Sequence, residues 1–183
     1  MNKKNVICIV GRTGSGKDYI ANHLSRKLNI PMVVSYTTRE KRSNETNGKE
    51  HWFITKDDAI DMLKDEDILA YTEIGDILYF ATLSSIDTIS SIYIIDPNGV
   101  EFLKNKFSDK LNIKVVYVYA DEDVRDRRAS HRSDYDSAFK KRNNAEDKQF
   151  NRFEELHSWD LLIDNSNDIS IDKICKDIWM LTK

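Results

Sequence analysis

Short apolar runs alternate with segments of helical periodicity along most of the chain. Five of these runs are rich in Val, Ile and Tyr and mostly lack the polar–apolar alternation of half-exposed strands. This pattern predicts strands that are covered on both faces. The predicted strands are Val6–Val10, Met32–Ser35, Ile92–Ile95, Val115–Tyr119 and Leu161–Ile163.

The segments between and after these runs have the pattern of helices. In the first of them, Ile20, Leu24 and Leu28 form an apolar stripe at helical spacing, and a similar stripe ends at Leu181 in the last. The predicted helices are Lys17–Leu28, Lys56–Lys64, Leu83–Ser90, Gly99–Lys106, Asp123–His131, Asp136–Leu156 and Ile169–Leu181.

The order of the elements predicts an α/β fold, with a mostly parallel sheet and helices on both of its faces. Residues 35–82 break the alternation with short polar strands and turns, and the sequence TEIGDILYFAT predicts a hairpin around Gly75-Asp76. We interpret residues 35–82 as a lobe inserted into a single domain that covers residues 1–183.

Composition narrows the classes of function. The net charge of −3 argues against a surface built to bind nucleic acid. The two cysteines, Cys8 and Cys175, have no metal-site or disulfide spacing and are expected to be buried or half-buried. No stretch approaches the ~20 apolar residues of a membrane span. We therefore expect a cytoplasmic protein that binds neither nucleic acid nor membrane.

The sequence GRTGSGKD lies between the first predicted strand and the first predicted helix. Glycines let successive N–H groups point inward, the helix start adds partial positive charge, and the lysine reaches the β and γ phosphates. The alternative is a turn that merely carries a lysine. The predicted phosphate-binding residues are Gly11, Arg12, Thr13, Gly14, Ser15, Gly16, Lys17 and Asp18.

Asp18 stands where such loops have Ser or Thr, whose hydroxyl binds Mg²⁺. A carboxylate is also a hard oxygen ligand suited to this ion. We therefore predict that Asp18 binds Mg²⁺, either directly or through its water shell, and that Asp96 is a candidate for a further contact through water.

The segment VVSYTTREKRSNETNGKEHWFI resembles the substrate-binding signature of guanylate kinases. Two arginines close together form a fork for an oxygen-rich dianion, although alone they are equally typical of a solvated loop. The matching residues are Ser35, Thr37, Thr38, Arg39, Arg42, Glu45, Gly48 and Phe53.

The resemblance continues along the chain. IYIIDPNG resembles the family's strand that ends in an acid, here Asp96, and RRASHRSD resembles its lid helix, with Arg128 and Arg132. Arg142 follows as a third lid arginine, and WDLLIDN resembles a late strand. The likeness therefore runs from about Val6 to Asn165.

The resemblance implies a P-loop kinase fold and a nucleoside monophosphate kinase that uses ATP and Mg²⁺. Arg128 would join the ATP site, and a lid at about 125–145 would close over the transferred phosphoryl group. Neighbouring Arg127 and His131 are the alternative to Arg128 and Arg132 in this lid. The implied catalytic residues are Lys17, Arg39, Arg132 and Arg142. The implied acceptor-binding residues are Ser35, Arg39, Arg42, Glu45, His51, Tyr79, Thr82 and Asp96.

The differences from the family concentrate on the acceptor. His51 replaces a tyrosine, the hairpin is about two residues longer, and either Tyr79 or Phe80 matches the family's phosphate-binding tyrosine. The position of a guanine-reading glutamate falls on Leu69 or Ala70, neither of which accepts a hydrogen bond from a base. Ile94 also replaces an acid two residues before Asp96. GMP or dGMP stays the leading acceptor, ahead of other nucleoside monophosphates.

Two alternatives stay open beside this kinase. One is a kinase for a phosphorylated sugar, which the altered hairpin would favour. The other is a catalytically inactive module that binds a protein partner, against which the complete phosphate loop argues. The sequence is compatible with a monomer or a homodimer.

Overall fold

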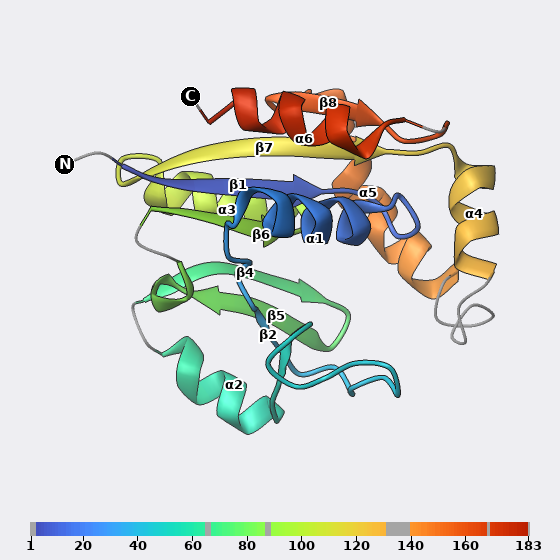
Figure 1. The fold of residues 1–183 in the computed structure, drawn as a ribbon. Coiled ribbons are helices and arrows are strands. Elements are labelled where there is room, and N and C mark those ends of the chain that lie inside the picture. The colour runs from blue at the N-terminus through green and yellow to red at the C-terminus, as the bar shows by residue number, and fades with distance from the viewer. Residues whose placement is uncertain (1–2, 65–66, 87–88, 131–139, 168, 183) are drawn as a thin grey trace.

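The computed structural model describes residues 3–64, 67–86, 89–130, 140–167 and 169–182, and only the backbone of residues 140–145. Two four-stranded sheets lie one above the other, with helices around them (Figure 1). In chain order, the elements are β1 (Lys4–Val10), α1 (Lys17–Leu28), β2 (Tyr36–Thr37), β3 (Trp52–Phe53), α2 (Lys56–Leu63), β4 (Ile68–Ile74), β5 (Ile77–Thr82), η1 (Leu83–Ser85), β6 (Ser90–Ile94), α3 (Pro97–Phe107), β7 (Leu111–Tyr119), α4 (Glu122–Ser130), α5 (Lys140–Glu155), β8 (Leu161–Asp164) and α6 (Ile171–Met180).

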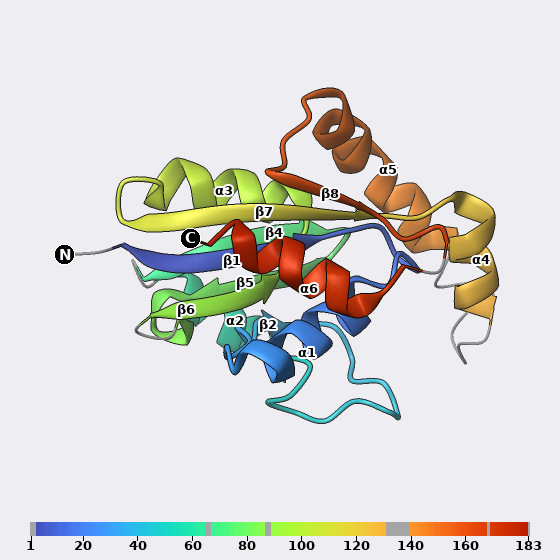
Figure 2. The same ribbon diagram turned by 45° about the horizontal axis from the view of Figure 1, so that its top comes forward.

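The first sheet has the strand order β6-β1-β7-β8, and all of its neighbouring strands are parallel. Helices α1 and α6 cover one face, and α3 and α5 lie on the other (Figure 2). In β1, Ile7 and Ile9 pack toward α1 and α6, whereas Val6, Cys8 and Val10 join the opposite cluster. Because both faces are buried, the strand reads as an unbroken apolar run, and the predicted α/β fold is confirmed.

The second sheet has the order β3-β2-β5-β4 and contains the predicted hairpin. Ile74 pairs with Ile77, so the loop is the two residues Gly75 and Asp76. Gly75 has φ +63°, which fits the type II′ turn that connects twisted antiparallel strands. Leu69 packs in the cluster that fills the α3 side of the parallel sheet, so the second sheet shares a core with the first.

Two predicted elements are wrong. Met32–Ser35 is not a strand: Met32 forms a single bridge with Ile92, and the next strand, β2, joins the other sheet. The N–H of Val33 donates to the carbonyl of Ile92, but the carbonyl of Ser35 already accepts from Trp52 at 2.9 Å, so the chain leaves the parallel sheet after this bridge. In the described part of the predicted helix Leu83–Ser90, Leu83–Ser85 form the short 3₁₀ turn η1 and Ser90 already begins β6; positions 87–88 lie outside the described residues.

A cluster of hydroxyl groups explains why no helix forms after β5. The Thr82 hydroxyl hydrogen-bonds those of Ser84 and Ser85, at 2.9 and 3.0 Å. Such local side-chain bonds favour turns over continued helix.

Other predicted elements are found with small shifts in their bounds. Helix α4 is Glu122–Ser130, and α5 is described from Lys140 onward; positions 131 and 136–139 of the two predicted helices lie outside the described residues. Cys8 and Cys175 are both buried. In the part of the chain that the structure describes, no helix has the length and apolar character needed to cross a membrane.

Candidate functional site

The glycine-rich loop joins β1 to the start of α1, at the end of the parallel sheet where the carboxyl ends of its strands lie (Figure 1). Gly14 and Gly16 have φ +85° and +91°, a backbone conformation that other residues resist. At Gly11, an added Cβ atom would lie 2.5 Å from the Ser15 hydroxyl and 2.6 Å from the carbonyl oxygen of Val118. Conformation and space therefore both require glycine along this loop.

The back of the loop is held through its carbonyl groups. The Asn165 side-chain amide donates to the carbonyl oxygen of Ser15 at 2.8 Å, and Arg128 donates to the same oxygen at 3.4 Å. Arg128 also donates to the carbonyl of Asn165 at 2.9 Å. Arg125, which the sequence did not single out, is buried and donates to the carbonyl of Thr13 at 3.5 Å. The carbonyl groups of Thr13 and Ser15 are therefore both held by side chains that lie outside the loop.

The side chain of Arg12 turns away from the loop toward α5. It donates to Asp147 at 2.6 Å, to Asn151 at 2.9 Å and to Glu154 at 3.2 Å. Tyr117 also donates to Glu154. Arg12, predicted as part of the ATP site, is therefore tied by its guanidinium to α5.

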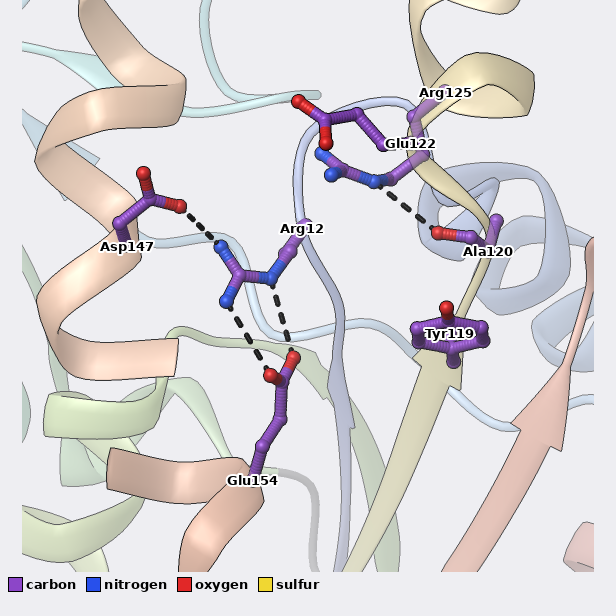
Figure 3. A pocket seen from close by; sticks show the side chains of 7 residues that line it. All are labelled: Arg12, Tyr119, Ala120, Glu122, Arg125, Asp147 and Glu154. Atoms are coloured by element: carbon purple, nitrogen blue, oxygen red, sulfur yellow. Dashed lines mark hydrogen bonds and ion pairs between the residues drawn. The ribbon is translucent and has the colours of Figure 1, made fainter. Parts of the chain in front are cut away.

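These contacts border a cavity of about 290 Å³ between α4 and α5 (Figure 3). The side chains of Arg12 and Arg125 both point toward the side of the cavity where Asp147 lies, and Arg125 donates to the carbonyl of Ala120 at 3.2 Å. The cavity lining is Arg12, Tyr119, Ala120, Glu122, Arg125, Asp147 and Glu154.

Ser15 lies in the loop, and Lys17 and Asp18 are the first two residues of α1. The hydroxyl of Ser15 is buried, and no partner for it is found among the described residues. Such an orphaned polar atom is typical of a ligand site. The Lys17 ammonium lies 3.6 Å from the carboxylate of Asp18, whose side chain is 59% exposed. Asp18 can therefore reach a metal ion in solvent beside the loop.

The arginine fork is built around a carboxylate. Arg39 donates to both oxygens of Glu45, at 2.8 and 2.9 Å, and Arg42 approaches Glu45 at 3.5 Å while donating its backbone N–H at 2.8 Å. Burial alone would raise the pKa of Glu45, but the bonds and charge of the two arginines lower it to about 2. The guanidinium of Arg39 also lies over the ring of Phe53, at 5.3 Å. Glu45 thus fixes both cations as a unit.

His51 lies beside this fork. Its ring nitrogen is 2.8 Å from the hydroxyl of Ser35, and its ring meets that of Tyr79 edge to face. Burial, and then the positive charge of Arg39, lower the pKa of His51, so the imidazole is neutral at pH 7. The negative charges of Glu45 and then Asp18 oppose this lowering of the pKa of His51.

Asp96 has a partner that the sequence did not reveal. The Thr72 hydroxyl donates to its carboxylate at 2.9 Å, and the N–H of Gly99 donates at 3.0 Å, which makes Asp96 the N-cap of α3. Burial raises the pKa of Asp96 against the effect of these bonds. Thr72 lies opposite Tyr79 in the hairpin. Counting outward from a two-residue turn at Gly75-Asp76 would have found this pair.

The other hairpin positions that the sequence predicted for the acceptor site differ in what they contact. Leu69 and Ala70, the positions predicted for a base-reading acid, are buried in the apolar core. Phe80 is also buried, whereas Tyr79 contacts His51. Thr82 hydrogen-bonds the serines of η1. Of these side chains, Tyr79 is therefore the one that contacts His51, which lies beside the arginine fork.

The described residues contain only part of the predicted lid. Arg128 reaches the loop, and Arg127 is exposed, so helix α4 presents the first to the site. His131 and Arg132 lie outside the described residues, and Arg142 is placed in α5 by its backbone alone.

Comparisons with known proteins agree on one family. The family model described as guanylate kinase matches residues 3–182. The guanylate kinase of Mycoplasmopsis pulmonis is 28% identical over 128 residues, which are 66% of this chain and 65% of that protein. The guanylate kinase of Clostridium tetani is 30% identical over 117 residues, which are 64% and 54% of the two chains. The chain thus spans about half to two thirds of these curated relatives.

A solved structure extends the comparison to the whole chain. The guanylate kinase of Anaplasma phagocytophilum superposes with a TM-score of 0.71 at 18% identity, covering 100% of this chain and 86% of that chain. At this identity the likeness concerns the fold, which is the same arrangement of a parallel sheet and flanking helices.

Proposed function

Because the chain belongs to the guanylate kinase family, we propose that it transfers the γ-phosphoryl group of ATP to GMP, dGMP or a related nucleoside monophosphate. One observation carries this proposal: the glycine-rich loop leads into α1 with Lys17 at its first position, and the same chain holds Arg39 and Arg42 around Glu45. A site for the donor phosphates and a site for the acceptor phosphate are what direct transfer needs.

On the donor side, the loop N–H groups and the start of α1 hold the phosphates of ATP, and Lys17 adds a mobile charge at the β and γ phosphates. Arg128 and Asn165 keep the loop in place from behind. Arg142 in α5 and Arg132 are proposed to neutralise charge on the transferred group.

On the acceptor side, Arg39 and Arg42 bind the phosphate of the monophosphate. Glu45 holds the two guanidinium groups in a fixed geometry, so less side-chain freedom is lost when the dianion arrives. Neutral His51 and Tyr79 add hydrogen-bond donors without adding charge. The attacking phosphate oxygen is already an anion, so no general base is needed.

The base is proposed to lie against Asp96, Thr72 and Ser35. Guanine offers N–H donors on its pairing edge, and Asp96 is the carboxylate available to accept them. Because Thr72 already donates to Asp96, we expect weaker discrimination than a carboxylate free of other partners would give.

Mg²⁺ fits the donor side as a shared ligand of protein and substrate. The described residues contain no cluster of three potential metal-binding side chains, and Mg²⁺ typically takes one or two carboxylates together with phosphate oxygens and waters. Asp18 would hold it, with Asp96 contributing through water. When bound, the ion supplies charge neutralisation at the phosphates.

The test is formation of ADP from Mg-ATP with a panel of GMP, dGMP, IMP, AMP, CMP, UMP and ribose phosphates. We expect turnover with GMP and dGMP, and measurable turnover with IMP. Turnover only with a sugar phosphate would replace the proposed acceptor class. Binding of ATP without turnover of any acceptor would instead favour a binding module.

A further inference from the structure

Among the carboxylates of α5 that contact the phosphate loop, Glu146 binds the backbone of the loop. Glu146 accepts from the backbone N–H of Thr13 at 3.0 Å and from the Thr13 hydroxyl at 2.8 Å. The two bonds use both carboxylate oxygens. Thr13 is itself buried, with 6% of its surface exposed. The contact is therefore a two-point attachment in a site with little solvent competition.

The residue before Thr13 in the loop is also attached to α5. Arg12 donates to Asp147, the residue after Glu146, and to Asn151 one turn further along the helix. Two consecutive loop residues are thus fastened to one face of α5. On the other side of the loop, Arg125 of α4 donates to the carbonyl of Thr13. Thr13 is consequently held at its N–H by α5 and at its C=O by α4.

This double attachment controls the peptide groups that follow. Gly14, the next residue, has φ +85°, and such a backbone can turn freely unless its neighbours are fixed. Phosphate binding depends on the directions of the N–H groups just after this point. Arg142 lies one helical turn before Glu146 in α5. The contact between Glu146 and Thr13 therefore also fixes how far the backbone of Arg142 lies from the loop.

We propose that Glu146 is a positioning residue of the donor site, which orients the phosphate loop by anchoring Thr13 to α5. The inference rests on the proposed function, in which this loop holds ATP. It assigns Glu146 no contact with substrate; its action passes through Thr13. Loss of the contact is expected to weaken the binding of ATP and to slow transfer, while leaving the acceptor site intact.

The test compares Glu146→Ala and Glu146→Gln with the control Glu155→Ala, which alters an exposed residue of the same helix. Calorimetry gives the Kd of ATP without acceptor, and steady-state kinetics give kcat and the KM of GMP. Glu146→Ala should raise the Kd of ATP and lower kcat, each by about tenfold, the order expected when a charge-assisted hydrogen bond is lost. The KM of GMP should change by less than about threefold.

Glu146→Gln separates the hydrogen bonds from the charge. Its amide oxygen can accept from the Thr13 N–H, and its amide nitrogen can donate to the hydroxyl, so ATP binding should stay within about threefold of wild type. Glu155→Ala should match wild type. ATP binding that is unchanged or tighter in Glu146→Ala would overturn the proposal, as would a loss in Glu146→Gln equal to that in Glu146→Ala. Because ATP binding is measured without acceptor, the result stands whether or not GMP is turned over.

Discussion

Replacing Gly14 by alanine tests how tightly the phosphate loop is built, and Gly75 provides a matched control. Both glycines have positive φ, +85° at Gly14 and +63° at Gly75. An alanine in this conformation costs about 1 kcal/mol at either place. The two sites differ in space: a Cβ atom at Gly75 meets nothing within 4 Å, whereas at Gly14 it would lie 2.7 Å from the carbonyl oxygen of Arg125.

The overlap at Gly14 is with backbone, so it is relieved only by moving the loop or α4. Such overpacking adds about 2 kcal/mol, for a total of about 3 kcal/mol. In a chain of this size, about 1 kcal/mol corresponds to about 2–4 °C in Tm. We therefore expect Gly75→Ala to lower Tm by about 2–4 °C and Gly14→Ala to lower it by about 6–12 °C.

Calorimetric titration with ATP completes the comparison. Displacing the loop misdirects its N–H groups, so Gly14→Ala should weaken ATP binding by about tenfold or more, while Gly75→Ala leaves it unchanged. Thermal unfolding and titration are measured on the same protein samples. Equal losses of Tm in the two variants, or unchanged ATP affinity in Gly14→Ala, would refute the assignment of this loop.

Three further predictions concern single side chains. Lys17→Ala should lower kcat by several orders of magnitude, because Lys17 is proposed to bind the β and γ phosphates. Its Tm should change little, because the one ion pair of Lys17 among the described residues is with the exposed Asp18. A near-normal rate would be incompatible with the donor site. Arg39→Ala should mainly raise the KM of the nucleoside monophosphate, and a change confined to the KM of ATP would reverse our division of the two sites. Glu45 has a folded-state pKa of about 2 against an ordinary 4.5, so its carboxylate stabilises the fold above about pH 4.5, and this stabilisation is lost as the pH falls toward 2. In urea unfolding, the difference in midpoint between wild type and Glu45→Gln should narrow across that window, and a constant difference would contradict the ion-pair assignment.

The phosphate loop and the hairpin could be predicted because their geometry is local. Glycine spacing between a buried strand and a helix defines the loop, and Gly75-Asp76 between apolar runs defines the turn. Two predicted elements were wrong. After its bridge at Met32 the chain crosses to the other sheet, where Ser35 bonds with Trp52, and this crossing depends on tertiary structure. Hydroxyl groups around Thr82 favour a turn where apolar periodicity indicated a helix.

The sequence by itself determined the α/β fold and the family, because these follow from short-range periodicity and from motifs whose residues lie close together in the chain. Only the tertiary structure decided what each charged side chain faces. It directed Arg12 to carboxylates more than 130 residues away, placed Thr72 against Asp96, and turned Arg128 rather than Arg127 toward the loop. Such pairings depend on which helix and strand faces meet after the core is packed, and no local pattern encodes that meeting.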